Sequence, residues 1–268
     1  MTDFTRYEAL LQRLSHLPSL LVAYSGGVDS TLLAVAAHAA LGDRCRCVLA
    51  VGDVSPEGEA AAARELAGVL GLSLIEVETQ ELADARFTAN PPDRCYWCKI
   101  ELFGLLRGVA DAHGLAFIAD GSNADDLADH RPGSRAAAES GVISPLQDVG
   151  MTKADIRSIA CELGLPNGNK PSMACLASRF PYGEAITESG IAQVAAAENA
   201  LRGLGLRQFR VRSHGTVARV EVAPDEMEAA WLAREAISAA GRLAGFSYAA
   251  LDLEGYRTGS LNEVLPEP

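Results

Sequence analysis

The stretch Ser25-Gly26-Gly27-Val28-Asp29-Ser30 has the composition of a loop that binds a chain of phosphates. An apolar run at 20–23 precedes it and another at 32–37 follows it, so we expect a strand, a tight turn and a helix. Two adjacent glycines let the backbone approach a ligand closely, and the free N–H groups and dipole of a helix start attract negative charge. Ser25, Ser30 and Thr31 add hydroxyl donors. The sequence therefore favours an anion site over a plain serine-capped turn.

This hexamer resembles the pyrophosphate-binding loop of the PP-loop ATP pyrophosphatases. The turn has neither the Gly-x-x-x-x-Gly-Lys of a Walker A loop nor the Gly-x-Gly-x-x-Gly of a dinucleotide fold. It also has no lysine that could reach a terminal phosphate. The resemblance implies that ATP is bound, AMP is transferred to an oxygen of the substrate and pyrophosphate is released.

Cys95 and Cys98 are three residues apart, where the proline-rich stretch 91–93 leads into a helix. Both sulfurs can lie on one edge of a metal ion or cluster, and the helix start with the adjacent Arg94 and Lys99 favours thiolate over thiol. A zinc half-site, a redox pair and part of a cluster all fit this spacing. The redox pair is the least favoured, because no central strand precedes the motif.

Cys175 lies in the irregular, non-periodic segment 171–183, at the expected junction between two domains. It is interpreted either as a site residue or as a small buried hydrophobe. The other cysteines flank or lie within regular elements, and we interpret them as packing residues: Cys45, Cys47 and Cys161.

Two pairs of basic residues have a spacing that suits phosphate or carboxylate. Arg210 and Arg212 alternate with apolar residues in a strand pattern, which places both arginines on one face of a sheet as a clamp. Lys153 and Arg157 lie one helical turn apart in an expected helix at 152–163, aimed at one place. A solvated outer face is the competing interpretation for each pair.

Alternating strands and helices must position these residues. Strands are expected at 20–23, 47–51, 72–77 and 115–119. Helices are expected before Pro18, where the pattern is amphipathic, and at 32–37, 57–70 and near 100–112. For the helix at 57–70, Ser55 is the expected N-cap and Pro56 the first helical position. This order predicts an α/β domain whose parallel sheet is covered on both faces.

Ligands of such sheets bind at the carboxyl ends of the strands, which brings the glycine turn near the acidic loop 120–126. Asp120 and Asn123 in this loop could contact the ribose, the base or a Mg²⁺ that bridges phosphates. An Asx-rich turn that caps the next helix is an equal alternative. The basic, turn-rich interval 129–135 could meet an anionic substrate, and a solvated loop is the favoured interpretation.

Glycines and prolines at 164–171 mark an expected boundary between a PP-loop domain at 1–168 and a smaller α+β domain at 169–268. In the smaller domain we expect a helix capped by Thr187, a hairpin of strands 208–212 and 217–222, a helix at 224–241 and a strand at 246–253.

The composition narrows the classes of partner. A formal net charge of −12, from 35 acidic and 23 basic residues, argues against a broad nucleic-acid surface. No apolar run approaches the length of a membrane span and no signal-peptide pattern opens the chain, so a cytoplasmic protein is expected. In a reducing compartment, six cysteines are not expected to form a disulfide framework.

Motifs along almost the whole chain resemble the LarE family of ATP-dependent sulfur transferases. They are the glycine loop, Ala174-Cys175-Leu176-Ala177-Ser178-Arg179, Arg210-x-Arg212, Ala218-Arg219-Val220-Glu221 and the stretch 252–259. The resemblance implies sulfur insertion into the pyridinium-dicarboxylate mononucleotide precursor of the nickel-pincer cofactor used by lactate racemase. It also implies ATP, Mg²⁺, an acyl adenylate and a homo-oligomer built through the second domain.

The family resemblance leaves two sources of sulfur. Some members sacrifice the sulfur of a single cysteine at the Cys175 position, which becomes dehydroalanine. This chain departs from that form because Cys95 and Cys98 are also present. Members with such a trio are thought to hold a [4Fe–4S] cluster on three cysteines, whose free iron carries an extra sulfide, with a sulfur donor as a further partner.

Other site residues are likewise implied by the resemblance. It assigns Asp29 to the ATP site and Arg179, Arg210 and Arg212 to the carboxylate or phosphate of the nucleotide substrate. Glu198 and Glu221 match acidic positions of the family's second domain, and ordinary surface carboxylates are an equal alternative for these two.

Three rival functions remain. A cluster-dependent tRNA thiolase joins the same loop to three cysteines, but the net charge of −12 and the lack of an RNA-binding appendage argue against it. An amidating synthetase related to NAD synthetase would not need the cysteines. A nucleotide-binding module without catalysis would leave Asp29, the cysteines and the basic pairs without a role.

Overall fold

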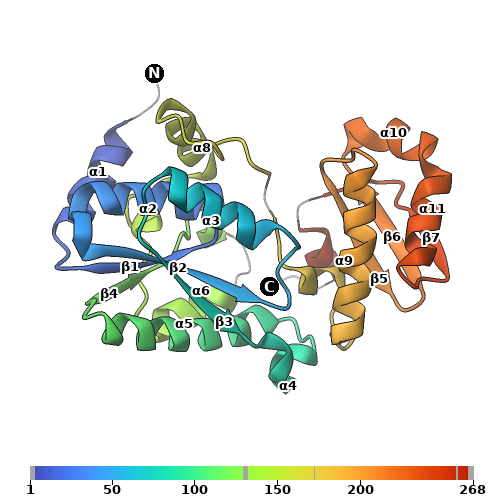
Figure 1. The fold of residues 1–268 in the computed structure, drawn as a ribbon, viewed down its shortest axis with the longest axis horizontal. Coiled ribbons are helices and arrows are strands. Elements are labelled where there is room, and N and C mark those ends of the chain that lie inside the picture. The colour runs from blue at the N-terminus through green and yellow to red at the C-terminus, as the bar shows by residue number, and fades with distance from the viewer. Residues whose placement is uncertain (1–3, 129–131, 172, 258, 265–268) are drawn as a thin grey trace. The chain divides into compact units, whose positions relative to one another are not determined.

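The computed structural model describes residues 4–128, 132–171, 173–257 and 259–264 (Figure 1). The chain forms two compact units that are interleaved in sequence. The first unit is made of Met1–Gly52, Gly58–Gln80 and Cys95–Met173, and the second of Asp53–Glu57, Glu81–Arg94 and Ala174–Pro268. The division into domains at 1–168 and 169–268 stays a prediction.

The first unit contains a four-stranded sheet in the order β3-β2-β1-β4, and all its strand pairs are parallel. Its strands are β1 (Leu20–Tyr24), β2 (Cys45–Gly52), β3 (Leu74–Thr79) and β4 (Phe117–Ala119). Its helices are α1 (Thr5–Ser15), α2 (Val28–Leu41), α3 (Glu59–Val69), α5 (Arg94–Ala112), α6 (Pro132–Glu139), α7 (Pro145–Asp148) and α8 (Lys153–Glu162). This confirms the predicted α/β class.

Helices cover both faces of this sheet. Successive side chains of β1 point to opposite faces, so they are buried in two different cores. Leu20 and Val22 are buried in a core that includes residues of α1, α2, α3 and α8. Leu21 lies in the other core, with residues of α5 and α6. Figure 1 shows the same two layers of helices on either side of the sheet. None of the helices in the described part of the chain is long and apolar enough to cross a membrane.

Strand β1 lies between β2 and β4, and the chain adds strands first on one side of it and then on the other. The carboxyl ends of β1 and β4 therefore lie side by side, with Val22 paired to Ala119. Loops at such a switch point diverge and leave a site for a ligand. The glycine turn follows β1, and Asp120 follows β4.

Two expectations for the first unit were wrong in detail. Helix α3 begins at Glu59 rather than near Pro56, because Gly58 has a φ of 82°, which ends a right-handed helix. The carbonyl of Val54 accepts the backbone N–H of Leu176 instead, at 2.8 Å. Part of the supposed loop at 129–135 is also helical, since α6 begins at Pro132; residues 129–131 lie outside the described chain.

The second unit contains a three-stranded sheet in the order β5-β6-β7. Strands β5 (Phe209–His214) and β6 (Val217–Val222) form the predicted antiparallel hairpin, and β7 (Tyr248–Leu251) runs parallel to β6. Its helices are α4 (Ala85–Thr88), α9 (Glu188–Gly203), α10 (Met227–Leu232) and α11 (Arg234–Leu243). The single helix expected at 224–241 is instead a 3-10 turn and two helices, which meet at Ala233.

Asn90 joins the early segment Glu81–Arg94 to the rest of the second unit. It is fully buried, and it is the one non-glycine residue of the described chain with a positive φ, 53°. Its side-chain amide donates to the carbonyls of Pro181 at 2.7 Å and Glu184 at 2.9 Å, and its backbone carbonyl accepts from Gly183 at 2.9 Å. These contacts explain why the residues just before Cys95 pack with those that follow Cys175 in sequence.

Candidate active site

The glycine loop has the expected strand, turn and helix. Gly26 has a φ of 71° and Gly27 is the extended N-cap of α2. The Ser30 hydroxyl donates to the Gly27 carbonyl at 3.1 Å and accepts the backbone N–H of Ser25 at 3.2 Å. The loop is thus closed on itself by Ser30, and the first N–H groups of α2 are available for an anion.

Gly26 is required for a second reason, which gives a first prediction. A Cβ at this position would lie 2.8 Å from the Cβ of Ala63, at a φ that disfavours side chains. We expect Gly26→Ala to push the loop off α3 and weaken ATP binding by about tenfold or more, since a tenfold change needs only about 1.4 kcal/mol. Calorimetric titration with ATP and Mg²⁺ measures this.

Gly42→Ala is the matched control, because Gly42 also has a positive φ of 57° but a Cβ there meets nothing within 4 Å. It carries a backbone penalty for positive φ without the clash and should keep the ATP affinity of the wild type. Equal loss of affinity in both variants would contradict the role given to Gly26.

Lys153 places a cation beside the glycine loop, which itself contains no lysine or arginine. Its ammonium forms an ion pair with Oδ2 of Asp29, while its backbone N–H donates to Asp125 at 2.8 Å. Arg157 does not share this target, so the expected common aim of the two was wrong. Arg157 reaches the loop after its own helix and donates to the carbonyls of Gly168 and Lys170, at 3.3 and 2.9 Å.

The loop after β4 packs directly on the start of α2. A Cβ on Gly121 would lie 3.0 Å from the backbone nitrogen of Ser30. The carboxylate of Asp120 is buried and accepts the hydroxyls of Ser122 and Ser144, each at 2.8 Å. The loop thus forms the Asx-type turn that was one of its two interpretations, and its contact with a nucleotide stays a prediction.

Asn123 completes this turn and is also buried. Its backbone N–H donates to the carboxylate of Asp126 at 2.9 Å, and its side-chain oxygen accepts the N–H of Asp125 at 3.0 Å. Asp125 in turn accepts from the first residue of α8. The acidic loop therefore links the end of β4 to the helix that carries Lys153.

Asn167 is a loop-positioning residue that the sequence analysis missed. It is buried, and its amide donates to the carbonyl of Gly26 at 3.0 Å and the hydroxyl of Thr31 at 2.9 Å. Its position in an expected interdomain segment gave no signal, because the contacts span more than a hundred residues of sequence.

The cysteines of the predicted trio differ in position and exposure. Cys95 is exposed and Cys98 is half-buried, both at the start of α5 in the first unit. Cys175 is half-buried, directly before a 3-10 turn of the second unit. None of the three is in a disulfide bond. Over the described residues, no set of three His, Cys, Asp or Glu side chains is gathered as ligands of one metal ion.

The other cysteines divide into a buried pair and an exposed residue. Cys45 and Cys47 are buried on β2, as expected of packing residues, and a hydrogen bond from the Cys47 thiol to Cys45, together with burial, raises the pKa of Cys47. Cys161 is exposed on α8, so the packing interpretation was wrong for it.

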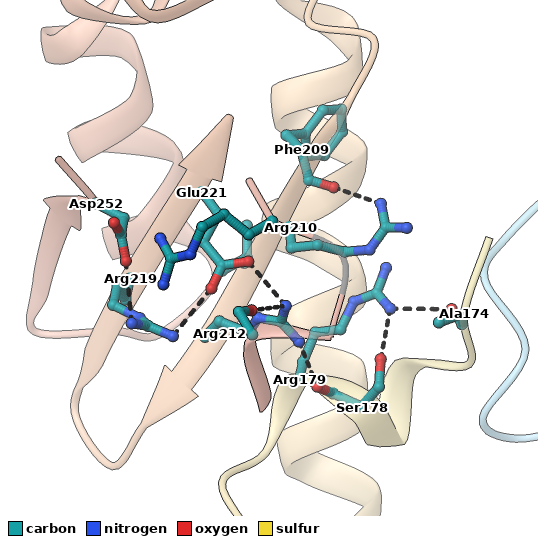
Figure 2. A network of polar contacts seen from close by, with 12 residues as sticks. Ala174, Ser178, Arg179, Phe209, Arg210, Arg212, Arg219, Glu221 and Asp252 are labelled. Atoms are coloured by element: carbon teal, nitrogen blue, oxygen red, sulfur yellow. Dashed lines mark hydrogen bonds and ion pairs between the residues drawn. The ribbon is translucent and has the colours of Figure 1, made fainter. Parts of the chain in front are cut away.

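Arg179, Arg210 and Arg212 form a buried basic cluster in the second unit (Figure 2). Arg179 comes from a short 3-10 turn and the other two from β5. The Arg179 guanidinium donates to both carboxylate oxygens of Glu198, at 2.8 and 3.0 Å, and Arg212 donates to Glu221 at 2.8 Å. The solvated-face interpretation of Arg210 and Arg212 was wrong, because they keep only 4% and 6% exposure.

The surroundings of Arg210 suit an anionic ligand. Its guanidinium donates to the Phe209 carbonyl at 2.7 Å and lies 5.0 Å from the centre of the Tyr256 ring. Burial and the neighbouring charge of Arg179 lower the pKa of Arg210 from its ordinary value. A carboxylate or phosphate bound here would accept hydrogen bonds from these arginines. Its negative charge would also reduce the repulsion between their positive charges.

The arginine cluster is also tied to the segment that carries Cys175. The Arg179 guanidinium donates to the carbonyl of Ala174 at 2.9 Å, and Arg212 donates to the carbonyl of Ser178 at 2.7 Å (Figure 2). Arg179 also donates to the carbonyl of Cys175, at 3.1 Å. The backbone around Cys175 is thus fixed by the residues expected to bind substrate. These hydrogen bonds would keep an anion bound to the arginine cluster and the side chain of Cys175 in one region of the second unit.

Known proteins similar to this chain span nearly its full length. The chain is 42% identical over 263 residues to an uncharacterized protein of Synechocystis, covering 97% of this chain and 98% of that protein. It is 37% identical over 262 residues to the pyridinium-3,5-bisthiocarboxylic acid mononucleotide synthase of Lactiplantibacillus plantarum, covering 97% of this chain and 95% of the synthase.

A more distant similarity is confined to about half the chain. The B subunit of the glutamine-hydrolyzing GMP synthase of Archaeoglobus fulgidus is 28% identical over 156 residues, which cover 54% of this chain and 51% of that subunit. No protein-family model matches the sequence. The near full-length similarity to the bisthiocarboxylic acid synthase shows that the chain belongs to the LarE family.

Proposed function

We propose that this protein is an ATP-dependent sulfur transferase that converts carboxylates of a pyridinium-dicarboxylate mononucleotide into thiocarboxylates, in the synthesis of the nickel-pincer cofactor. The observation that carries the proposal is the 37% identity over 97% of the chain to a synthase whose named product is a pyridinium bisthiocarboxylic acid mononucleotide. Such a product differs from a dicarboxylate in having sulfur in place of oxygen. That exchange needs an activated carboxylate and a sulfur nucleophile.

The first unit supplies the activation step. The β- and γ-phosphates of ATP bind the glycine loop, and a substrate carboxylate oxygen attacks the α-phosphorus. The bond from that phosphorus to the bridging oxygen breaks, pyrophosphate leaves and an acyl adenylate forms. Asp29 fits a Mg²⁺ ligand, because its Oδ1 is buried and is among the side-chain atoms for which the described chain provides no hydrogen-bond partner.

The arginine cluster of the second unit supplies the binding of substrate. A pyridinium dicarboxylate mononucleotide carries a phosphate and two carboxylates, and Arg210 and Arg212 suit these anions because guanidinium forms paired hydrogen bonds with them. Glu198 and Glu221 hold Arg179 and Arg212 in place, at 2.8 Å in each pair. Their role is therefore positioning rather than surface charge.

Cys95, Cys98 and Cys175 supply the sulfur chemistry in this proposal. None of the three is in a disulfide bond, and their sulfurs would be the ligands of a [4Fe–4S] cluster, which would supply a sulfide nucleophile when bound. Transfer of this sulfur to the acyl carbon would break the bond to the adenylate oxygen and release AMP.

Cys175 itself is the alternative nucleophile. Its thiolate would attack the same carbon and release AMP. Loss of the Cα proton and cleavage of the Cβ–S bond would then give the thiocarboxylate and leave dehydroalanine. Repeated turnover on a cluster requires a separate sulfur donor, whereas this route consumes the chain.

Self-association through the second unit is a further part of the proposal. Its support is that this unit exposes several large apolar side chains, among them Trp231 at 61%, Leu232 at 73%, Leu243 at 90%, Tyr248 at 68% and Leu253 at 90%. Exposed apolar side chains that lie together mark surfaces covered by another subunit, and this proposal places these residues in such a surface.

The test of the proposed function is release of pyrophosphate from ATP that depends on the pyridinium-dicarboxylate nucleotide. We expect one AMP and one pyrophosphate for each thiocarboxylate formed, and no stimulation by ammonia or glutamine. Pyrophosphate release that depends on tRNA, with tRNA binding that weakens steeply in salt, would contradict the proposal in favour of a tRNA thiolase.

A further inference from the structure

Lys153 occupies the place at which a phosphate-binding loop needs a mobile positive charge. Its ammonium pairs with Asp29, in the first turn of α2, from the first residue of a different helix. The side chains of Lys153 and Asp29 keep 33% and 24% exposure, so a ligand can reach both. The glycine loop itself contains no lysine or arginine.

The start of α8 is fixed firmly enough to aim this ammonium. Thr152 and Asp155 form a capping box, with the Thr152 N–H donating to Asp155 at 2.9 Å and the Asp155 N–H donating back at 3.2 Å. Arg6 adds an ion pair to Asp155 at 2.7 Å, and Ile156 is fully buried against the core shared with α2. Only the flexible stem of Lys153 is therefore free to move.

We propose that Lys153 is a catalytic residue that binds the phosphate chain of ATP and stabilises the departing pyrophosphate. When the nucleotide is absent, Asp29 holds the ammonium at the mouth of the loop. When Mg²⁺ and ATP arrive, Asp29 turns to the metal and the ammonium turns to the phosphates. A lysine suits this exchange, because its compact charge rotates on a flexible stem. The inference rests on the proposed function for its reaction, but not for its binding step.

The binding step is tested by chemical labelling, since the chain has only three lysines, Lys99, Lys153 and Lys170. Trace acetylation followed by mass spectrometry reads each amine separately. We expect saturating magnesium pyrophosphate to protect Lys153 about tenfold, while Lys99 serves as the internal reference. Unchanged labelling of Lys153, or protection of Lys170 alone, would overturn the inference.

The catalytic step is tested with Lys153→Met. We expect substrate-dependent pyrophosphate release to fall about 100-fold, the loss typical of removing one group that stabilises charge in a transition state. Lys153→Arg should recover part of this rate because it restores the charge. The affinity for pyrophosphate should fall while the affinity for adenosine stays, whereas a collapsed loop would lose both.

Arg13→Met is the matched control, because it removes a cation from a surface ion pair of the first unit, with Asp148 at 3.4 Å, without touching the glycine loop or α8. Its rate of pyrophosphate release should stay within about twofold of the wild type, as expected for one partly exposed ion pair. A wild-type rate in Lys153→Met would overturn the inference and leave the proposed function intact. If the wild type itself releases no pyrophosphate with the pyridinium substrate, the proposed function fails, while protection of Lys153 still reports its binding role.

Discussion

Cys175→Ser is expected to lower the rate of thiocarboxylate formation on the order of 10³-fold or more, because both proposed sulfur routes use this thiol. Release of pyrophosphate should continue. The fold around the residue should survive. Ser178 donates to the backbone carbonyl of Cys175 at 2.8 Å and Arg179 donates to it at 3.1 Å, and neither contact involves the sulfur. Product analysis by mass spectrometry, alongside a pyrophosphate assay, separates the two half-reactions.

Cys161→Ser is the control for this variant, because Cys161 is an exposed free thiol with no place in either route. Cys95→Ser then separates the routes themselves. A cluster that delivers sulfide loses a ligand in that variant and sulfur transfer stops, whereas a sacrificial Cys175 continues for a single turnover. Sulfur transfer at the normal rate by Cys175→Ser would contradict both routes.

Glu198→Gln is expected to lower the free energy of unfolding by about 3–5 kcal/mol, the cost of leaving one partner of a buried ion pair uncompensated. Glu198 keeps 2% exposure, accepts two bonds from Arg179, and accepts the backbone N–H of Val211 at 3.0 Å. A neutral amide cannot balance the buried arginines that remain. Urea denaturation followed by circular dichroism measures the loss.

The same variant should also impair sulfur transfer, since Arg179 connects Glu198 to the carbonyls of Ala174 and Cys175. Glu263→Gln is the control, because Glu263 forms a surface ion pair with Arg257 at 3.0 Å in the same unit. That pair is exposed, so its loss should leave stability unchanged. Equal stability of the wild type and Glu198→Gln would contradict the buried-pair account of the cluster.

The fold of the first unit was predictable because local patterns determine it. Runs of apolar residues gave the strands of a parallel sheet, and two glycines flanked by serines gave the turn after β1. The start of α3 was not predictable in the same way. Pro56 is a good first residue of a helix, but Gly58 adopts a positive φ and the preceding backbone bonds to Leu176, far along the chain.

The chemistry of the site was predictable only where it lies within one motif. The alternation at 208–212 places Arg210 and Arg212 on one face, but their burial depends on helices and turns elsewhere in the sequence. The partner of Asp29 was missed for the same reason, since Lys153 is 124 residues away. Long-range contacts of this kind leave no trace in spacing or composition.

The central claim is tested most directly by anaerobic incubation of the protein with iron, sulfide, ATP, Mg²⁺ and the pyridinium-dicarboxylate mononucleotide, followed by mass spectrometry of the nucleotide and of the intact chain. The account predicts a nucleotide in which carboxylate oxygen is replaced by sulfur, with one AMP and one pyrophosphate per sulfur. An unmodified Cys175 assigns the sulfur to a cluster, and dehydroalanine at that position assigns it to the cysteine itself. A nucleotide that gains no sulfur, or that gains nitrogen instead, would contradict the account.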